Sequence, residues 1–427
     1  MQKREYRVGM KRIAVLFAAT FIGLAGCGSS MQGNGQTVDG QMADGSGIAN
    51  ADGQGVEANI KTTDDQGAKT DSKTADEQGG KTSGLSKNTE PAVREIYDVM
   101  TVPYMRLQAY GDHAEEALDL GVEKIHSIYD LLSTGNPDSE VGKLNANGSG
   151  VLGEDGIFLL ETSLNLYKET DRAFDVSVYP LMELWGFTNL YKESLTDVLG
   201  KSDDSDQQES KEHKVPSDAE IQETLKKVDS SKIEYNPETG DVTLPDGMKI
   251  DFGGIAKGYA SESVAEILRD NGVESALLNL GGNIQTIGRK PDGSKWRIAL
   301  NDRNKGGFLG ILTVEDSAVI TSGGYERKFE DADGNVYFHI LDPKTGYPAD
   351  NGFSADASVT IICKDGTMAD ALSTAMYVLG PEKAEEYWKK HSDEFQMIMM
   401  TDDDKMYVTE GIADDYQSDY KFEVIKA

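Results

Sequence analysis

Asp370 and Thr374 are four residues apart in the run Ala369-Asp370-Ala371-Leu372-Ser373-Thr374-Ala375. Residues at i and i+4 lie on the same face of an α-helix, so this carboxylate and this hydroxyl would point the same way. Mg²⁺ prefers such oxygen ligands and usually keeps several waters as well. The same pair also occurs on helices simply facing solvent, or with the threonine hydrogen-bonded to its own backbone. The spacing alone therefore leaves a metal site as one of two interpretations.

The glycine pair Gly253-Gly254 separates two predicted elements, a strand that ends at Asp251 and a helix over Ala256–Asp270. Adjacent glycines let a ligand approach the backbone closely. The start of a helix presents free N–H groups and a partial positive charge, which suit phosphate, and Lys257 could add a full charge. The alternative is a tight turn with a lysine in solvent. The segment is not a P-loop, because the glycine, lysine and serine or threonine spacing of that motif is absent.

His339 follows the short β-like run Val336–Phe338, and the turn-forming pairs Asp342-Pro343 and Thr345-Gly346 come soon after it. A histidine beside such a shaped loop could act as a general base near neutral pH. A single histidine at the end of a strand more often has a structural role, so both interpretations stay open on these residues alone.

The hydrophobic pattern from about Glu95 onward predicts helices and strands that are mixed without strict alternation, which favours an α+β fold. Ser217 and Glu220 form a capping-box sequence for a helix that runs to Val228. Two further helices are expected over His113–Leu132 and Gly156–Thr170. The expected strands are Tyr104–Tyr110, Lys232–Tyr235, Asp241–Leu244, Ala276–Leu280, Trp296–Leu300, Gly310–Val314, Ala318–Ile320, Ala357–Ile362 and Gln396–Met400.

The composition excludes some partners. The chain has 427 residues, of which 38% are hydrophobic, and this is enough for one large domain or two ordinary ones. Its 74 acidic and 42 basic residues give a formal net charge of -32. Such a surface repels the phosphates of nucleic acid, so we expect no nucleic-acid partner. For the same reason, a diphosphate ligand would need a metal ion or local cations to be held.

The N-terminal segment is typical of a secretion signal. Five basic residues within the first twelve precede the apolar run Ile13–Leu24, which is too short to span a bilayer. The run ends in Leu24-Ala25-Gly26-Cys27, which resembles the bacterial lipobox, whose cysteine is lipidated and becomes the first residue of the mature chain. We therefore expect residues 1–26 to be a lipoprotein signal peptide and Cys27 to anchor the protein to the cell membrane, outside the cytoplasm. The alternative is an ordinary signal peptide with an incidental cysteine.

Residues 27–92 are rich in small and polar residues, and no aromatic residue occurs between Cys27 and Tyr97. Such a segment buries too little apolar surface to offset its chain entropy, so we expect a disordered tether with a reach of roughly 45 Å. One folded domain is expected over 93–427, with a polar surface insertion at 194–215. If Cys27 carries a lipid, Cys363 has no partner and the domain has no internal disulfide.

Several motifs, taken together and in order, resemble the ApbE family of FAD:protein FMN transferases. The clusters around Phe174 and Ser322 would each pass alone as core followed by a turn, but the whole ordered set is far more specific. The resemblance extends from about residue 95 to about residue 425. The matching segments are Asp138-Ser139-Glu140 with Leu144-Asn145, Ala173-Phe174-Asp175 with Leu184-Trp185-Gly186-Phe187, Asp251 through Ala260, Asn279-Leu280-Gly281-Gly282-Asn283, Thr321-Ser322-Gly323 with Tyr325, His339 through Gly346, and Ala369 through Thr374.

The resemblance implies an α+β enzyme that binds FAD and Mg²⁺. Such an enzyme transfers FMN through a phosphoester bond to a Thr or Ser hydroxyl of a target protein and releases AMP. Carried over to this chain, it makes Asp370, Thr374 and the backbone carbonyl of Gly254 the metal ligands, and His339 the catalytic residue. The implied flavin site consists of Ala173, Phe174, Asp175, Asp251, Lys257 and Ile340. The family often has Met-Gly-Thr before its first strand, in contact with FAD, whereas this chain has Met100-Thr101-Val102-Pro103, so that contact is not carried over.

The resemblance also implies a protein acceptor, such as an exported or membrane flavoprotein. Two other functions would use the same residues. A Mg²⁺-dependent FAD pyrophosphatase would replace the acceptor hydroxyl with water and release FMN and AMP. A non-catalytic flavin-binding lipoprotein would need neither a base nor a metal at the leaving group, so the presence of His339 with Asp370 and Thr374 argues against it.

Overall fold

A computed structural model of the chain describes residues 90–188, 215–302 and 305–427. The expected signal peptide, Cys27, and nearly all of the expected tether and insertion lie outside the described residues. Within the described ranges, no helix combines the length and the apolar character that a membrane crossing needs.

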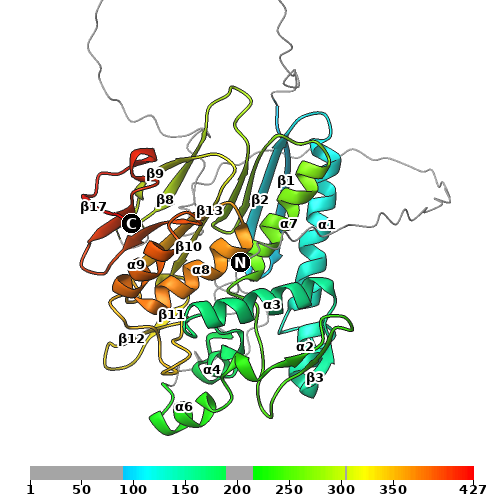
Figure 1. The fold of residues 1–427 in the computed structure, drawn as a ribbon, viewed down its shortest axis with the longest axis vertical. Coiled ribbons are helices and arrows are strands. Elements are labelled where there is room, and N and C mark those ends of the chain that lie inside the picture. Colours follow the sequence, from blue (N-terminus) through cyan, green and yellow to red (C-terminus); the bar gives the residue numbers. More distant parts are fainter. Residues whose placement is uncertain (1–89, 189–214, 303–304) are drawn as a thin grey trace, which may run out of the picture. The chain divides into compact units, whose positions relative to one another are not determined.

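In the part of the chain that the structure describes, nine strands form one sheet (Figure 1). Neighbouring strands are antiparallel except for the final pair, β15 and β17, which is parallel. Strands from the N-terminal and C-terminal parts of the domain form the two edges of the sheet, and strands from the middle of the chain form its centre. In spatial order they are β1 (Ala92–Val99), β2 (Val102–Tyr110), β6 (Ser275–Leu280), β7 (Asn283–Ile287), β10 (Ala318–Gly323), β13 (Ser358–Cys363), β14 (Gln396–Met400), β15 (Met406–Thr409) and β17 (Phe422–Ile425).

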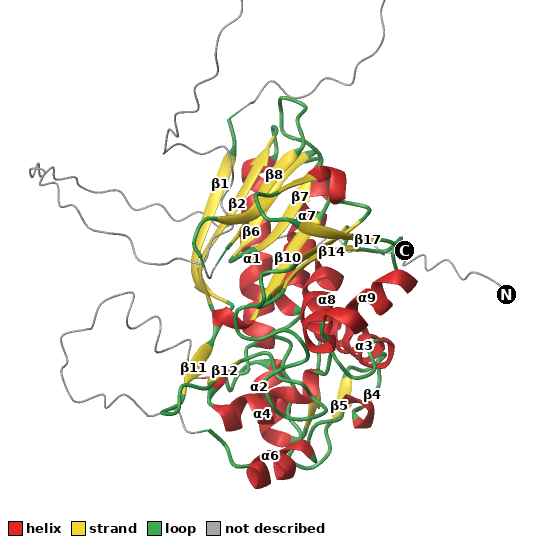
Figure 2. Cartoon of the chain, turned by 90° about the vertical axis from the view of Figure 1, so that its left-hand side faces the viewer, coloured by secondary structure: helices red, strands yellow, loops and turns green. Residues whose placement is uncertain are grey.

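Both faces of this sheet are covered, and the side chains of its central strands alternate between two cores. On β6, Leu278 belongs to the core that the helices share, whereas Leu277 belongs to the core on the other face. The helical layer consists of α1 (Ala114–Leu132), α7 (Ala256–Asp270) and α8 (Gly366–Leu379) (Figure 2). The opposite face packs on a three-stranded sheet of β16 (Tyr416–Gln417), β9 (Phe308–Val314) and β8 (Trp296–Asn301). Because both faces are buried, a central strand such as β6 has hydrophobic residues on both of its sides.

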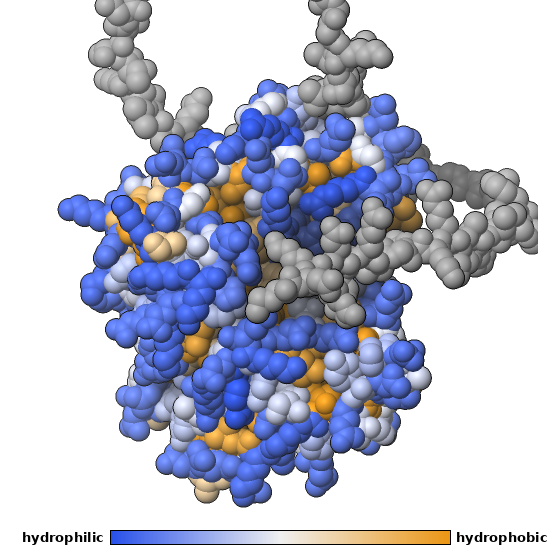
Figure 3. Space-filling view, in the orientation of Figure 1, coloured by the Kyte–Doolittle hydropathy of each residue, from blue (hydrophilic) through white to orange (hydrophobic). Residues whose placement is uncertain are grey.

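Apart from one helix of 16 residues, the remaining elements are short, and they lie mainly toward the lower part of Figure 1. A third sheet has the order β3 (Ser149–Val151), β5 (Asp241–Thr243) and β4 (Glu234–Tyr235), and β11 (Lys328–Glu330) pairs with β12 (Val336–Phe338). The other helices are α2 (Glu140–Asn147), α3 (Glu154–Glu169), α4 (Tyr179–Trp185), α6 (Asp218–Leu225), α9 (Pro381–Lys390) and the 3₁₀ turns Val176–Val178, Ser230–Lys232, Gly324–Glu326 and Ala413–Asp415. On the face drawn in Figure 3, hydrophilic residues cover most of the surface, with smaller hydrophobic areas between them.

The α+β prediction is confirmed, and so are most of the expected elements. The helix over Ala256–Asp270 has the expected bounds, and the Ser217–Glu220 capping box is present with both of its reciprocal hydrogen bonds. That second helix ends at Leu225, before the expected Val228. The strand expected to end at Asp251 is wrong, because residues 248–251 belong to no strand.

Helices α7 and α8 touch at two glycines. A Cβ atom on Gly258 would lie 2.1 Å from the carbonyl oxygen of Gly366 and 2.5 Å from the Cβ of Asp370, closer than any side chain can come. The start of α8 is fixed by Asp365, whose side chain accepts the N–H groups of Thr367 and Met368 at 2.8 and 3.2 Å. The two helices can therefore lie this close only because residue 258 has no side chain.

Replacing Gly258 with alanine should force α7 and α8 apart and lower the free energy of unfolding by about 2 kcal/mol or more, since an added methyl group here meets backbone. Denaturant or thermal unfolding measures this change. Gly135→Ala is the matched control, because a Cβ on Gly135 meets no atom within 4 Å. Equal stability of the two variants would show that the helices can separate without cost.

Candidate active site

Every residue that was expected from the sequence to bind flavin, to bind the metal or to transfer a proton lines one pocket. Its walls come from five separated stretches of chain, and the empty space between them, counted out to its open mouth, is about 920 Å³. The expected residues that line it are Ala173, Phe174, Asp175, Asp251, Gly254, Lys257, His339, Ile340, Asp370 and Thr374.

The lining combines an apolar set with a charged and hydroxyl-bearing set. Apart from the expected residues, the apolar set comprises Val176, Val178, Met182, Leu341 and Pro343. Gly254 marks a place where the two kinds meet. A Cβ on Gly254 would lie 3.3 Å from the ring of Phe174 and 3.6 Å from the Oγ1 of Thr374. The pocket thus offers apolar surface for a ring system beside polar groups for an ionic ligand.

Asp370 and Thr374 lie on the same side of α8, as their spacing predicts. The Oδ2 of Asp370 accepts the N–H of Gly258 at 2.8 Å, and its Oδ1 lies 3.9 Å from the Nζ of Lys257. That ion pair is too long for a good hydrogen bond, so this buried carboxylate keeps capacity for another ligand. The Oγ1 of Thr374 lies 3.3 Å from the Oγ of Ser322.

These oxygens suit Mg²⁺, a hard cation that binds few protein groups and relies on water or substrate phosphate for the rest. Within the described ranges, no group of three or more His, Cys, Asp and Glu side chains could hold a metal ion. The expected set is of a different kind, with one carboxylate from Asp370, one hydroxyl from Thr374 and one backbone carbonyl from Gly254. A cation bound by so few protein charges would depend on an anionic ligand in the pocket.

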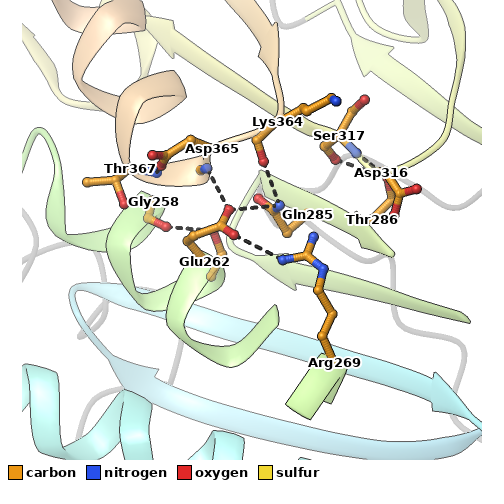
Figure 4. A network of polar contacts seen from close by, with 12 residues as sticks. Gly258, Glu262, Arg269, Gln285, Thr286, Asp316, Ser317, Lys364, Asp365 and Thr367 are labelled. Carbon is orange, nitrogen blue, oxygen red and sulfur yellow. Dashed lines mark hydrogen bonds and ion pairs between the residues drawn. The ribbon is translucent and has the colours of Figure 1, made fainter. Parts of the chain in front are cut away.

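Glu262, on α7, fixes the start of α8 one turn before Asp370 (Figure 4). Its carboxylate accepts the N–H of Gly366 at 2.9 Å and the side-chain amide of Gln285 at 3.1 Å, and it pairs with Arg269 at 3.1 Å. Gln285, from β7, also donates to the carbonyl of Lys364 at 3.3 Å. A second contact thus joins the helices one turn from the bond between Gly258 and Asp370, and the two together set the orientation of the ligand face.

Asp175 lies deeply buried at the edge of the apolar lining. Its Oδ1 accepts the backbone N–H of Ser177 at 2.9 Å and the hydroxyls of Ser177 and Ser230. Its Oδ2 is buried and has no hydrogen-bond partner among the described residues. Burial raises the pKa of this carboxyl group, and the bonds from Ser177 and Ser230 oppose that rise. A buried acceptor left open in a pocket wall suits an N–H donor on a ligand.

His339 is held by its backbone, whose N–H donates to the carbonyl of Arg327 at 3.0 Å. Its Nδ1 is buried without a hydrogen-bond partner among the described residues. Burial, and then the positive charges of Arg327 and Lys257, hold the pKa of His339 well below its usual value of 6.5. The imidazole is therefore neutral at neutral pH, which is the form that can accept a proton.

Asp251 stands at the turn that leads into α7. Its Oδ1 accepts the N–H of Gly253 at 3.0 Å, which shapes the turn, and burial raises its pKa despite the nearby charges of Arg327 and Lys257. The positive charges of Arg327 and Lys257 therefore act on both Asp251 and His339. In a chain with a net charge of -32, this local pair of cations is what an anionic ligand requires.

Arg327, Ser322 and Glu326 also line the pocket, and the sequence analysis assigned them no individual role. Ser322 belongs to a segment that resembles the family, and Glu326 and Arg327 follow that segment directly, but a resemblance does not say which side chains turn inward. Arg327 carries the clearest signal that could have been used. It is a basic residue two positions after a matched motif in a strongly acidic chain, and a diphosphate needs local cations.

Known proteins resemble this chain over most of the described domain. The model of the ApbE family matches residues 100–399. A protein of Klebsiella pneumoniae named FAD:protein FMN transferase is 34% identical over 278 residues, which are 63% of this chain and 78% of that protein. A protein of Vibrio cholerae with the same name is 30% identical over 305 residues, 70% of this chain and 84% of its own length. The crystal structure of the ApbE protein from Thermotoga maritima has a TM-score of 0.64 at 29% identity, and the match covers 75% of this chain and 98% of that one.

In the protein free of ligands, His339 should stay neutral as the pH falls through 6.5, because its folded pKa lies below that value. The unfolded chain binds this proton at a higher pH than the folded one, so the group costs stability as the pH falls from 6.5 toward the folded pKa. Titration of the histidine ring signals by NMR measures the folded pKa, and His339→Gln identifies the signal by its absence. A midpoint at or above 6.5 would contradict this environment for the ring.

Proposed function

The chain belongs to the ApbE family, and from this premise we propose that it is an FAD:protein FMN transferase. It would move FMN from FAD to a Thr or Ser hydroxyl of a target protein and release AMP. The observation that carries the proposal is the convergence in one pocket of a histidine whose buried Nδ1 has no hydrogen-bond partner among the described residues, two cations and an oxygen-bearing helix face.

The two kinds of lining divide the work of binding FAD. The ring of Phe174, with the other apolar residues, offers contact area for the isoalloxazine. The open Oδ2 of Asp175 can accept a hydrogen bond from the imide N–H of that ring system. Lys257 and Arg327 supply positive charge for the diphosphate. Binding of the substrate would thus satisfy groups that the free pocket leaves unpaired.

In the transfer, the acceptor hydroxyl oxygen forms a bond to the phosphorus of the FMN part, and the bond from that phosphorus to the bridging oxygen breaks. The bridging oxygen leaves on AMP with the electron pair. Neutral His339 takes the hydroxyl proton, which makes the oxygen a better nucleophile. The positive charges of Lys257 and Arg327 favour the negative charge that develops on the phosphate oxygens.

Mg²⁺ fits this site, because Asp370, Thr374 and the carbonyl of Gly254 offer hard oxygen atoms in one pocket. When bound, the metal would supply charge stabilisation for the leaving phosphate. The two carboxylate oxygens of Asp370 have different roles. Its Oδ2 holds the Gly258 N–H at the start of α7, and its Oδ1 remains available.

We also propose that the enzyme works outside the cytoplasm. The lipobox-like sequence that ends at Cys27 supports a lipid anchor, and the polar stretch over 27–92 supports a flexible tether between that anchor and the domain. An exported or membrane flavoprotein is the acceptor that such a position allows.

Incubation with FAD, Mg²⁺ and candidate exported proteins tests the proposal, with mass spectrometry of the acceptor as the measurement. A mass increase that corresponds to FMN on a Thr or Ser residue is the expected result. AMP should appear only when an acceptor is present. Rapid AMP release from FAD without any acceptor would instead indicate a pyrophosphatase, and FAD left intact in every mixture would contradict both activities.

His339→Ala should reduce FMN transfer by about 10²–10⁴-fold, since that is the usual contribution of a general base. FAD binding should remain close to that of the unchanged protein, because the cations and apolar lining are intact. Transfer rates and the dissociation constant for FAD are measured side by side. Loss of binding together with activity would assign His339 a place in FAD binding instead.

Asp370→Asn keeps an oxygen for the Gly258 N–H but removes the negative charge. We expect unchanged thermal stability. Removing a residue that only supports a metal ligand typically lowers activity about 10–100-fold, and we expect a larger loss here because Asp370 would be a ligand itself. Excess Mg²⁺ should restore the activity only in part. Asp370→Ala is the companion variant. It should lose as much activity as Asp370→Asn and should also be less stable, because the Gly258 N–H loses its acceptor. Turnover of Asp370→Asn at the level of the unchanged protein, or turnover that survives chelation, would rule out this metal site.

A further inference from the structure

Asn145 forms a two-way hydrogen-bonded pair with the backbone of Ile250, a residue 105 positions later in the chain. Its Nδ2 donates to the carbonyl of Ile250 at 2.8 Å, and its Oδ1 accepts the N–H of Ile250, also at 2.8 Å. A neighbouring strand would make the same two bonds. The carboxamide therefore replaces a strand partner for a segment that belongs to no sheet.

The segment that Asn145 holds is the one that enters the pocket wall. Ile250 is fully buried, and the next residue, Asp251, lines the pocket and donates its backbone N–H to the carbonyl of Val176 at 2.8 Å. Val176 is itself part of the lining. Hydrogen bonds therefore fix the backbone of Ile250 to Asn145 and that of Asp251 to Val176, immediately before the turn that contains Gly254.

Helix α2, which carries Asn145, is anchored independently of the pocket. The Oγ of Ser139 accepts the N–H of Gly142 at 2.7 Å and donates to the carbonyl of Ser133 at 2.7 Å. Glu140 accepts the N–H of Gly153 at 2.8 Å. None of these side chains lines the pocket. The matched motif that runs from Asp138 to Asn145 therefore makes a fixed support, and Asn145 is the member that contacts the residue before Asp251.

We propose that Asn145 is a positioning residue of the FAD site, which sets Asp251 and the turn through Gly254 by pairing with Ile250. This inference rests on the proposed function. A carboxamide presents a donor and an acceptor side by side whatever the pH. A carboxylate of the same shape loses the donor and sets a negative charge against the carbonyl of Ile250, which leaves that buried group unsatisfied.

Asn145→Asp tests the proposal, because it changes two atoms and almost no volume. Hydrogen exchange followed by mass spectrometry should show faster exchange in a peptide that covers residues 248–254. FAD should bind about tenfold more weakly, since the pairing is worth roughly one to two hydrogen bonds. Glu140→Ala is the matched control, as it weakens α2 at its contact with Gly153 and leaves Ile250 paired. It should lower the melting temperature without weakening FAD binding.

The outcomes separate the inference from the proposed function. If the unchanged protein binds no FAD, the proposed function fails, whatever the exchange data show. If the unchanged protein binds FAD and Asn145→Asp binds it equally well, the positioning role is overturned. It is also overturned if Glu140→Ala weakens binding as much as Asn145→Asp does, because Asn145 would then only support the stability of α2.

Discussion

The contact between α7 and α8 is the constraint on which the site depends. The helices approach each other at Gly258 and Gly366, so closely that the backbone of one meets the backbone of the other. At this distance the N–H of Gly258 reaches the carboxylate of Asp370. A side chain at either glycine would move α8, and with it the two side-chain oxygens, from Asp370 and Thr374, that α8 contributes to the expected metal site. One geometric relation thus sets the packing of the helical layer and the position of the ligand face.

The pocket keeps polar atoms unsatisfied, which a protein core usually avoids. The Oδ2 of Asp175 and the Nδ1 of His339 are both buried without partners among the described residues. Backbone strain occurs beside them, since Asp171 and Arg172 have φ values of 49° and 68°, in the left-handed region that costs a non-glycine residue about 1 kcal/mol. The strained pair comes just before Ala173. Unpaired groups and strain around the same pocket indicate a site that is prepared for a ligand and not a surface optimised for stability.

The sequence predicts the repetitive parts of this fold well and the supporting contacts poorly. The helix over Ala256–Asp270 has a clear apolar period, so its bounds could be found. The strand expected at Asp251 fails for a physical reason, because its partner is the side chain of Asn145 and local pattern cannot reveal a partner 105 residues away. β7 was missed because Asn283, Gln285 and Thr286 interrupt its apolar residues, although all of them are buried.

The ten expected site residues line one pocket. The chemistry of any single one of them was not enough to predict it as a site residue. The spacing of Asp370 and Thr374 favours a common face, and the family resemblance supplies the rest. What neither could provide is the electrostatic setting, since the low pKa of His339 arises from its burial beside Arg327 and Lys257. That setting exists only when β12, α7 and the segment before β11 are packed together.

The same long-range dependence explains how the two pocket walls that carry Ala173 and His339 are joined. An ion pair links Asp171, before Ala173, to Lys344, after His339, but both side chains are largely exposed, at 87% and 40%. Such a pair contributes little to stability, because water screens it. Buried contacts join these walls instead, since the indole N–H of Trp185 donates to the carbonyl of Gly346 at 2.8 Å, and Met182 and Leu341 belong to one apolar cluster. A pocket supported from behind in this way can remain open at its mouth, as it must if a protein acceptor is to bring a hydroxyl group to His339.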